Sequence, residues 1–508
     1  MKISKLVEPE ILSKYHIDAN IEITGIAFDS REIKPGFIFF AITGYQLDGH
    51  KFIPDALNRG AALIIGEKAA SSLDLPDSSP YIQVGNARET LSQFAASFYS
   101  FPARKMRVIG VTGTDGKTTT SNLITGILKK AGKKVGKITT VDAEINGEIY
   151  DMGVHVTTPD ALSIQKFLSE MALSGTDYAI IESTSHGLSQ YRLSDCEFDI
   201  GVLTNITHEH YDFHGNYTEY RNAKAILFEL VNQTRSKNYD KFAIINADDE
   251  SYDFMKTKVG SHLLSYGIKN QDADILATEI EVNSDICSYF VSLPGDKAIK
   301  INSKILGNHN IYNSLAAIGV ANTQGIPFNV IQEYFLNPDS PKGRFEKVDL
   351  GQNFQVFVDY AHTENALNSL LSLANQIAKK RVILLFGLSG GPRDKSKRPA
   401  MGKIACENSD LAIITAVDWY PSENVHDILD QIEQGFTEAG GKYQETYWKI
   451  PNREEAINFT ISLAQPGDIV IIAGKGHETS LSINGVENVW SEVGKTKEAL
   501  TKRLNNEK

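Results

Sequence analysis

The sequence predicts an α/β protein of about three domains built on parallel sheets. From residue 106 onward, continuous apolar runs alternate with segments of helical periodicity, a pattern typical of strands that are covered on both faces. The chain has 508 residues, 42% of them hydrophobic, and is therefore too long for one ordinary core. A polar cluster follows each apolar run, which predicts ligand sites at the carboxyl edges of the sheets.

The rhythm of elements predicts domains at 1–102, 103–338 and 339–508. The first is a small α/β domain of short strands and turns, which closes where Pro102 and a basic cluster break the pattern. The second carries the runs RVIGVTG, DYAIIEST, FDIGVLTNI and KFAIINADD, and the third carries FQVFVDYAH, KRVILLFGLSGG, DLAIITAVD and GDIVIIAGKGHE. We expect the loop edges of these two parallel sheets to be able to face each other across a cleft.

Composition excludes several classes of protein. The formal net charge of -12 argues against a general nucleic-acid binder, although it permits a local basic pocket for a phosphorylated small molecule. The first residues lack an apolar core of signal-peptide length, and nowhere do 18 apolar residues run uninterrupted, so we expect a cytoplasmic protein without membrane insertion. The cysteines are far apart and form no CxxC pair, which indicates neither disulfides nor a thiolate zinc site: Cys196, Cys287 and Cys406.

The stretch GVTGTDGKTTT is a candidate phosphate loop. It fails the strict Walker A pattern, because Val111 stands where that pattern requires glycine. Gly113 and Gly116 still permit tight turns, Lys117 supplies a cation, and Thr118 can offer a hydroxyl to magnesium. The alternative is a glycine-containing turn with an exposed lysine, but a strand before and a helix after favour nucleoside triphosphate binding.

The helix after this loop is predicted from an apolar stripe that ends in lysines and Gly132. Its stripe consists of Leu123, Ile124, Ile127 and Leu128. Phosphates bound by the loop would therefore lie at a helix N-terminus, where free N–H groups and the dipole favour anions.

Two further clusters suggest metal binding. Glu182 stands at the end of an apolar strand and can hold magnesium together with Thr118, although a cap or surface role is the commoner one for such a residue. The next strand is followed by a cluster that is either functional or simply a polar loop: His208, His210, Asp212 and His214. Zinc is not indicated, because no HExxH motif or cysteine accompanies the histidines.

Five motifs in order make the pattern specific. GTDGKTTT, ESTSHGL, THEHYDFHG with YRNAK, DYAHTENAL and AGKGHE together resemble the ATP-dependent Mur ligases of the MurE type. Enzymes of this type add the third amino acid to the UDP-linked peptidoglycan precursor during cell-wall biogenesis, and so serve cell shape and cell division. The resemblance covers almost the whole chain. It implies an N-terminal domain for the UDP end of the substrate, a central P-loop ATPase domain and a C-terminal Rossmann-like domain for the amino acid.

The resemblance also assigns roles at the nucleotide. It implies catalytic roles for Lys117, Glu182, His210 and Lys224. It implies magnesium on Thr118, Glu182 and His210, and a second magnesium on Lys224 as N-carboxylysine. The residues implied in ATP binding are Gly113, Thr114, Asp115, Gly116, Lys117, Thr118, Thr119, Asn310, Asn313, Arg344, Asp359 and His362. Without the family, Lys224 would be read as a solvated helix residue, and the two asparagines as an N-cap and a surface amide.

The resemblance assigns the UDP-linked substrate to a separate set of positions. These are Ser30, Asp48, Gly49, His50, Thr157, Thr158, Ser185, Gln190 and Arg192. An Asp-Ser-Arg turn such as the one containing Ser30 would otherwise be an ordinary loop.

The implied chemistry is amide-bond formation. ATP phosphorylates the terminal carboxylate of UDP-MurNAc-L-Ala-D-Glu, and the amine of the incoming amino acid attacks the acyl phosphate, giving amide, ADP and phosphate. Such chemistry needs charge neutralisation and positioning rather than a protein nucleophile, which fits the absence of a Ser-His-Asp or catalytic-cysteine signature. The implied partners are small molecules, and the resemblance implies a monomer.

The match weakens at the amino-acid site. Relatives that add meso-diaminopimelate usually carry DNPR, whose arginine pairs with the distal carboxylate, whereas this chain has DWYP at 418–421. The positions that still match amino-acid contacts are Arg393, Asp418, Gly474 and Glu478. The loop around Arg393 has one extra residue, and SEVG stands at 491–494 where a DDRE-type segment is usual. Lysine, ornithine or another diamino acid is thus as compatible as diaminopimelate, since Glu478 and Asp418 can attract an ammonium group.

Asp115 is a milder departure, because asparagine is common there in the family. It adds negative charge beside ATP, which we expect to raise the dependence on magnesium.

Three alternatives stay open. A folylpolyglutamate synthase-like ligase shares the last two domains but lacks a first domain of this type. A Mur-like ligase with a different carboxylate acceptor is compatible with the divergent amino-acid pocket. A non-catalytic nucleotide-binding regulator would not need Lys117, Glu182, His210 and Lys224 together.

Overall fold

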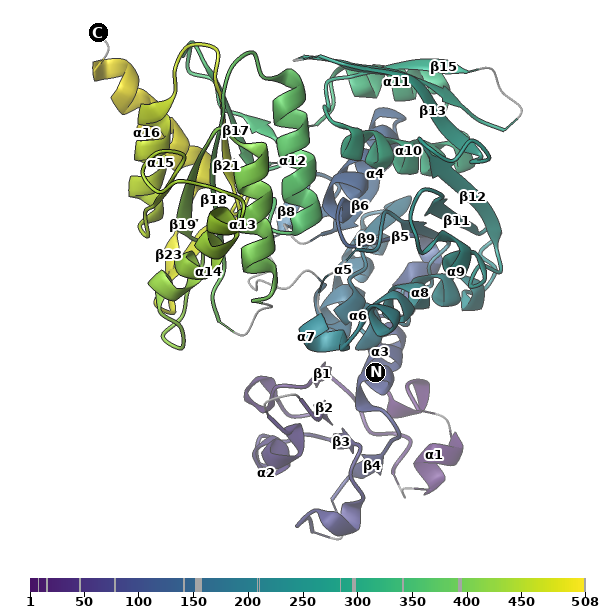
Figure 1. Ribbon diagram of the computed structural model, residues 1–508. Coiled ribbons are helices and arrows are strands. Elements are labelled where there is room, and N and C mark those ends of the chain that lie inside the picture. Colours follow the sequence, from purple (N-terminus) through teal and green to yellow (C-terminus); the bar gives the residue numbers. More distant parts are fainter. Residues whose placement is uncertain are drawn as a thin grey trace.

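The computed structural model describes residues 1–506 except 8, 15–16, 45–46, 77–78, 140–141, 151–157, 208, 210, 284, 295–297, 340–341 and 392–394. Figure 1 shows three parts: a purple N-terminal part, a blue-to-teal central part above it, and a green-to-yellow C-terminal part beside the central one. Each part contains its own main sheet, and the strands of each sheet come from one continuous stretch of the chain.

The N-terminal sheet has four parallel strands in the order β1-β2-β3-β4. Its strands are β1 (Gly25–Ala27), β2 (Phe37–Ala41), β3 (Leu63–Gly66) and β4 (Tyr81–Gln83). Its helices are α1 (Pro9–Lys14), α2 (Ile53–Asn58) and α3 (Ala87–Phe98), with 3-10 turns η1 (Ile3–Lys5), η2 (Ser30–Glu32), η3 (Gly49–Phe52) and η4 (Ala70–Ser72). Both faces are covered, because Phe40 and Ile65 belong to one apolar cluster and Phe39 and Ile64 to another. A connecting turn, η5 (Pro102–Lys105), leads into the central part.

The central sheet has eleven strands in the order β15-β14-β13-β12-β11-β10-β5-β9-β6-β7-β8. Its seven parallel strands are β5 (Arg107–Thr112), β6 (Val135–Ile138), β9 (Tyr178–Glu182), β10 (Ile200–Leu203), β11 (Phe242–Asn246), β12 (His262–Gly267) and β13 (Ile275–Val282). Antiparallel strands extend it at both edges: β7 (Ala143–Ile145), β8 (Glu148–Tyr150), β14 (Cys287–Ser292) and β15 (Ile299–Ser303). Strand β5, which leads into the phosphate loop, lies between β9 and β10.

Helices cover the parallel part of this sheet. They are α4 (Lys117–Lys130), α5 (Ala161–Leu173), α6 (Ser185–Ser189), α7 (Tyr211–His214), α8 (Tyr217–Gln233), α9 (Tyr252–Lys256), α10 (Asn308–Thr323) and α11 (Phe328–Leu336). The predicted stripe of α4 is fully buried, and α4 packs against α10. Gly132, with φ +78°, follows the end of α4 as predicted.

The C-terminal sheet has six strands in the order β16-β17-β21-β18-β19-β20, parallel except at β16. They are β16 (Glu346–Lys347), β17 (Gln355–Asp359), β18 (Val382–Leu388), β19 (Leu411–Ala416), β20 (Tyr447–Lys449) and β21 (Ile469–Ala473). The helices are α12 (Glu364–Ile377), α13 (Lys397–Asn408), α14 (Val425–Glu438), α15 (Arg453–Leu463) and α16 (Glu492–Asn506). A separate hairpin of β22 (Ser480–Ile483) and β23 (Val486–Val489) follows β21.

The predicted fold class is confirmed. All eight apolar runs singled out in the sequence form strands, and each lies in a largely parallel sheet. Strand β13 and its antiparallel neighbour β14 were not predicted, because they bury alternate residues instead of forming continuous apolar runs. All three cysteines are free, and within the described ranges no helix is long and apolar enough to cross a membrane.

Candidate active site

The candidate phosphate loop, residues 113–116, joins β5 to α4. Its two glycines have positive φ angles of +148° at Gly113 and +84° at Gly116. A Cβ at Gly113 would lie 1.8 Å from Thr204 Oγ1, and one at Gly116 would lie 2.3 Å from Asn313 Oδ1. Both positions therefore need glycine, for conformation and for space.

A second loop, residues 204–207 after β10, braces the phosphate loop. Thr204 Oγ1 donates to the Asp115 carbonyl oxygen at 2.6 Å, and the Asp115 N–H donates to Asn205 Oδ1 at 3.0 Å. The Thr207 N–H donates to Thr114 Oγ1 at 2.9 Å. Because these partners follow the neighbouring strand of the same sheet, the loop has its shape without help from a ligand.

Two lysines converge on one carbonyl of the loop. Lys117 Nζ donates to the carbonyl oxygens of Gly113 at 3.0 Å and Thr114 at 2.7 Å, and Lys224 Nζ donates to that of Gly113 at 2.6 Å. Lys224 lies on α8 with 1% of its surface exposed, so it is not the solvated helix residue that its sequence alone would suggest. Burial and the nearby Lys117 ammonium hold the pKa of Lys224 well below its usual value.

A hydroxyl and a carboxylate meet beside these lysines. Thr118 Oγ1 lies 3.1 Å from each carboxylate oxygen of Glu182, and both residues are buried. Glu182 ends β9, next to β5, as the sequence predicted. Oxygen donors of this kind suit magnesium, which takes its remaining ligands from water and phosphate oxygens.

The rest of the predicted metal set is not assembled in the described residues. His210, the third expected ligand, lies outside them, as does His208 of the same cluster. No group of three His, Cys, Asp or Glu side chains with metal-binding geometry occurs in the part of the chain that the structure describes. Within these limits, the donors that are described fit magnesium.

The two asparagines predicted at the nucleotide lie in the first turns of α10 and are buried. Asn313 Nδ2 donates to Asn310 Oδ1 at 3.1 Å, and Thr120 Oγ1 donates to Asn313 Oδ1 at 3.3 Å. Asn313 is therefore not a surface amide, and it contacts the helix that begins at the phosphate loop.

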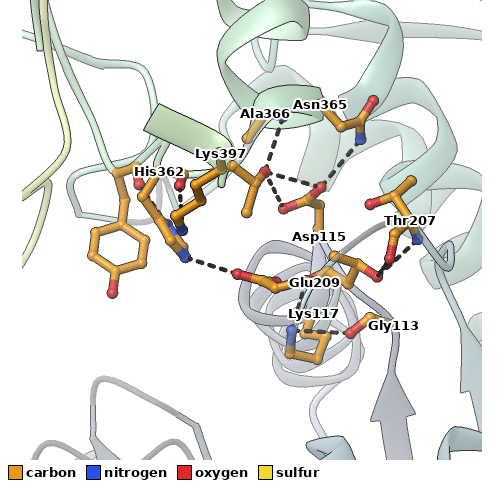
Figure 2. A network of polar contacts seen from close by, with 12 residues as sticks. Gly113, Asp115, Lys117, Thr207, Glu209, His362, Asn365, Ala366 and Lys397 are labelled. Atoms are coloured by element: carbon orange, nitrogen blue, oxygen red, sulfur yellow. Dashed lines mark hydrogen bonds and ion pairs between the residues drawn. The ribbon is translucent and has the colours of Figure 1, made fainter. Parts of the chain in front are cut away.

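The C-terminal part contacts this loop directly, as Figure 2 shows. Thr363 Oγ1 and Asn365 Nδ2 both reach the carboxylate of Asp115. His362 Nε2 lies 3.8 Å from Glu209 Oε1. The carboxyl edge of the third sheet thus meets that of the central sheet.

Two more predicted nucleotide residues lie near this contact. Asp359, at the end of β17, accepts hydrogen bonds from the N–H groups of Phe345 and Ala361, both at 2.7 Å. Burial raises the pKa of Asp359, while the Arg344 guanidinium acts in the opposite direction. Arg344 stacks over the Tyr360 ring at 4.6 Å, and its Nε is buried without a hydrogen-bond partner among the described residues.

Three family models match successive parts of the chain. They are described as "Mur ligase family, catalytic domain" at 22–99, "Mur ligase middle domain" at 111–321 and "Mur ligase, glutamate ligase domain" at 343–476. A protein of Geobacillus thermodenitrificans named UDP-N-acetylmuramoyl-L-alanyl-D-glutamate--2,6-diaminopimelate ligase is 39% identical over 91% of this chain and 92% of its own length. The chain belongs to the Mur ligase family.

Other relatives agree with this assignment. A Syntrophomonas wolfei protein of the same name is 40% identical over 94% of both chains. A Roseiflexus protein named UDP-N-acetylmuramyl-tripeptide synthetase is 38% identical over 95% of both.

Among solved structures, that of a UDP-N-acetylmuramoyl-L-alanyl-D-glutamate--2,6-diaminopimelate ligase aligns over 99% of both chains, with a TM-score of 0.68 and 27% identity. A folylpolyglutamate synthase of Mycobacterium tuberculosis aligns over 76% of this chain and 92% of its own, with a TM-score of 0.62 and 15% identity, which shows a shared fold only.

Three of the residues predicted to hold the UDP-linked substrate in the central part of this Mur ligase form one network: Thr158, Gln190 and Arg192. Thr158 Oγ1 donates to the Glu182 carbonyl oxygen at 3.1 Å, and Arg192 Nη1 donates to the Thr158 carbonyl oxygen at 2.5 Å. Arg192 Nη2 also donates to Gln190 Oε1 at 2.7 Å. Ser185 Oγ is buried with no hydrogen-bond partner among the described residues, while Thr157 lies outside them. The network joins this predicted substrate region to the strand that carries Glu182.

The predicted UDP residues of the N-terminal part follow the carboxyl ends of β1 and β2. The Glu67 N–H donates to His50 Nε2 at 3.1 Å, so the ring proton is on Nδ1, which lies 2.7 Å from Asp48 Oδ1. Asp48 also pairs with Lys68 at 2.6 Å. Gly49 packs against the Ile42 backbone, where a Cβ would lie 2.7 Å from two backbone atoms, and Ser30 is buried at the start of η2.

In the C-terminal part of the ligase, a buried lysine joins the predicted amino-acid residues. Lys475 Nζ lies 3.0 Å from Asp418 Oδ1 and also pairs with Glu478. Glu478 Oε1 accepts from the Tyr360 hydroxyl at 3.1 Å, and Asp418 Oδ1 accepts from the Ser482 N–H at 2.9 Å. Gly474, with φ +112°, precedes this lysine, and Arg393 lies outside the described residues.

Sequence reasoning missed the residues that hold these sites in shape. Lys475 stands inside the GKGHE motif, and Thr204 and Asn205 stand at the end of the run FDIGVLTNI. The sequence pattern that could have identified them is a polar residue directly after a buried strand, which is common to many positions.

Proposed function

We propose that this Mur ligase uses ATP to join an amino acid to UDP-MurNAc-L-Ala-D-Glu, in peptidoglycan precursor synthesis. The observation that carries the proposal is the likeness, at 37–40% identity over more than 90% of both chains, to relatives named as ligases of this substrate. The phosphate loop with its two lysines and the Thr118–Glu182 pair supplies the matching chemistry.

The chemistry requires two anions to meet. An oxygen of the substrate's terminal carboxylate attacks the γ-phosphorus of ATP, and ADP leaves. The amino group then attacks the carbonyl carbon of the acyl phosphate, phosphate leaves, and the amine loses a proton. Lys117 and the N–H groups at the start of α4 lie where they can offset the phosphate charge.

Magnesium would be held by Thr118 and Glu182, with His210 proposed from the family motif. The ion supplies positive charge that offsets the repulsion between carboxylate and triphosphate. The buried Glu182 carboxylate orients the Thr118 hydroxyl beside the phosphate loop.

We also propose that Lys224 is carbamylated. Its side chain is buried beside the phosphate loop, where a free ammonium is costly and a carbamate would add two oxygen ligands. Loss of activity on removal of bicarbonate, with recovery on its return, would support the modification.

The remaining assignments follow the same pattern. We propose that Gly113 to Thr119, Asn310, Asn313, Arg344, Asp359 and His362 bind ATP. For the UDP-linked substrate we propose Ser30, Asp48, Gly49, His50, Thr157, Thr158, Ser185, Gln190 and Arg192, and for the amino acid Arg393, Asp418, Gly474 and Glu478. We propose boundaries at 102/103 and 338/339, which no strand pairing crosses in the described ranges. A cytoplasmic monomer is likewise a proposal.

The net charge of the predicted amino-acid site indicates which kind of amino acid it would bind. Lys475 already neutralises part of the negative charge of Asp418 and Glu478, which leaves a net charge of about -1 among these three groups. This negative charge suits the distal ammonium of a diamino acid. Trp419, Tyr420 and Pro421 stand where DNPR has Asn, Pro and Arg. We therefore propose a diamino acid, with L-lysine, L-ornithine and meso-diaminopimelate as candidates.

Phosphate release tests the proposal. Purified protein is given ATP, magnesium and UDP-MurNAc-L-Ala-D-Glu, with meso-diaminopimelate, L-lysine, L-ornithine or no amino acid in parallel. Release that rises with one amino acid, with its tripeptide seen by mass spectrometry, is the expected result. No release in any of these mixtures would overturn the proposed acceptor and favour a ligase of another carboxylate.

A further inference from the structure

Asp115 has a set of contacts that the proposed chemistry does not use. It lies in the phosphate loop, yet its side chain points to the C-terminal part of the molecule, as Figure 2 shows. Thr363 Oγ1 lies 3.2 Å from Asp115 Oδ1, and Asn365 Nδ2 donates to Asp115 Oδ2 at 3.1 Å. These partners are about 250 residues away in sequence, so the contact exists only when the two parts are assembled.

The direction of each bond is fixed by its partners. Thr363 is the N-cap of α12 and accepts a hydrogen bond from the Ala366 N–H at 3.1 Å, so its hydroxyl proton is free to point at Asp115. Asn365 uses an amide N–H, which can only donate. The carboxylate also faces the positive end of the α12 dipole. These donors suit a carboxylate, and they act against burial and the Glu209 carboxylate, which raise the pKa of Asp115.

The backbone of Asp115 is held as firmly as its side chain. Thr204 and Asn205 bond its carbonyl oxygen and N–H, which ties the residue to the strand edge that carries the phosphate loop. One residue thus connects the loop backbone on one side to α12 on the other. The Glu209–His362 contact at 3.8 Å and the packing of α12 on α10 lie in the same interface.

We propose that Asp115 is a positioning residue that couples the phosphate loop to the docking of the C-terminal part. Its carboxylate holds α12 against the loop, so the approach of the amino-acid site to the phosphates depends on this contact. The role in turnover rests on the proposed ligase function, whereas the docking itself does not.

Because coupling is reciprocal, a ligand that holds the loop also favours docking of the C-terminal part, and docking favours the ligand.

The decisive variants change Asn365, which is exposed and outside the nucleotide and substrate sets. Asn365→Asp sets a second carboxylate against that of Asp115, while an acidic residue in the first turn of α12 is compatible with the helix. Asn365→Ala removes the bond without adding charge. The exchange Asp115→Asn with Asn365→Asp restores an amide-to-carboxylate bond with donor and acceptor reversed. Glu364→Gln, at the adjacent exposed position of α12, is the matched control.

Two readouts are measured for each variant of the full chain. Small-angle X-ray scattering without ligands is expected to give a larger radius of gyration for Asn365→Asp, an intermediate or unchanged value for Asn365→Ala, and the wild-type value for the exchange and for Glu364→Gln. In phosphate release, Asn365→Asp is expected to lower kcat/KM for the amino acid about tenfold, with partial recovery in the exchange variant.

An unchanged radius of gyration in Asn365→Asp, or an exchange variant that stays as expanded as the single variant, would overturn the proposal. If the wild type shows no turnover, the proposed function fails while the scattering result still decides on docking. An Asn365→Asp protein that is unfolded by circular dichroism would leave the decision to the exchange variant, whose return to the wild-type radius supports the proposal.

Discussion

The phosphate loop and the predicted amino-acid pocket both use a lysine at the carboxyl edge of a parallel sheet, but they balance its charge differently. Lys117 donates to two neutral backbone carbonyls, which leaves its positive charge available to an anion. Lys475 lies between two carboxylates, Asp418 and Glu478, which outweigh it. One edge is thus prepared for phosphates and the other for a cation, and both use the same residue type.

The largest expected effect tests the first half of this comparison. Lys117→Ala removes a charge that offsets the transferring phosphate, so we expect turnover to fall about a thousandfold. Phosphate release measures it. Lys130→Ala, at the far end of the same helix, is the control and should keep full activity. A fall of less than tenfold in Lys117→Ala would show that the loop lysine does not neutralise the phosphates.

The second prediction concerns the metal. Glu182→Gln keeps the shape of the side chain but removes its charge, so we expect the magnesium concentration for half-maximal rate to rise about a hundredfold. Magnesium titration of phosphate release measures it. Asp177→Asn, just before the amino end of the same strand, should leave the titration unchanged. An unchanged magnesium requirement in Glu182→Gln would exclude this carboxylate as a ligand.

The third prediction tests the charge balance of the predicted amino-acid site. Lys475→Met leaves Asp418 and Glu478 without their shared cation, so we expect the free energy of unfolding to fall by about 2 kcal/mol, less than for a fully buried pair because both carboxylates are partly exposed. Urea unfolding at pH 7 measures it. Adding Asp418→Asn should recover part of the loss. If Lys475→Met were as stable as the wild type, the three groups would not form a coupled charge cluster.

The smallest expected effect concerns two buried histidines. His309 lies in the first turn of α10, and His477 lies in the GKGHE motif. Burial lowers the pKa of His309 to about 4 and that of His477 to about 3, with Arg344 acting in the same direction on both. Because their folded pKa values lie below the unfolded value of 6.5, each stabilises the fold fully above pH 6.5 and loses that contribution as pH falls. The loss continues to pH 4 for His309 and to pH 3 for His477.

Gln substitutions test this pH dependence. His309→Gln and His477→Gln should each remove about 1 kcal/mol of the acid destabilisation between pH 7 and 5.5, measured by urea unfolding at several pH values. His262→Gln, at an exposed position, should change nothing. Acid sensitivity equal to that of the wild type in both variants would mean that other groups dominate.

The fold was largely predictable because its strands are continuous apolar runs with polar residues at their carboxyl ends. The glycines of the phosphate loop and the strand-end Glu182 followed from the same pattern and lie where it predicts. Strands β13 and β14, near one edge of the central sheet, were not predicted, because they bury only alternate residues.

Contacts between distant residues could not be predicted. Nothing local in TGTDGK indicates that the Asp115 side chain meets Thr363, and nothing in GKGHE indicates that Lys475 meets Asp418. The first pair depends on how the edges of two sheets meet, and the second depends on the strand order of the C-terminal sheet, in which β18 separates β21 from β19.

The position of β5 has a consequence for synthesis on the ribosome. This strand ends at Thr112, but its two neighbours end at Glu182 and Leu203, so about ninety residues must be made before it is flanked on both sides. In the C-terminal sheet, β17 waits longer, because its parallel partner β21 ends at Ala473. At roughly 5–20 residues per second, the central sheet, whose last strand ends at Ser303, has many seconds to fold before the C-terminal one can be completed. The two halves of the active-site edge are thus finished in sequence, and the contact between them is among the last to form.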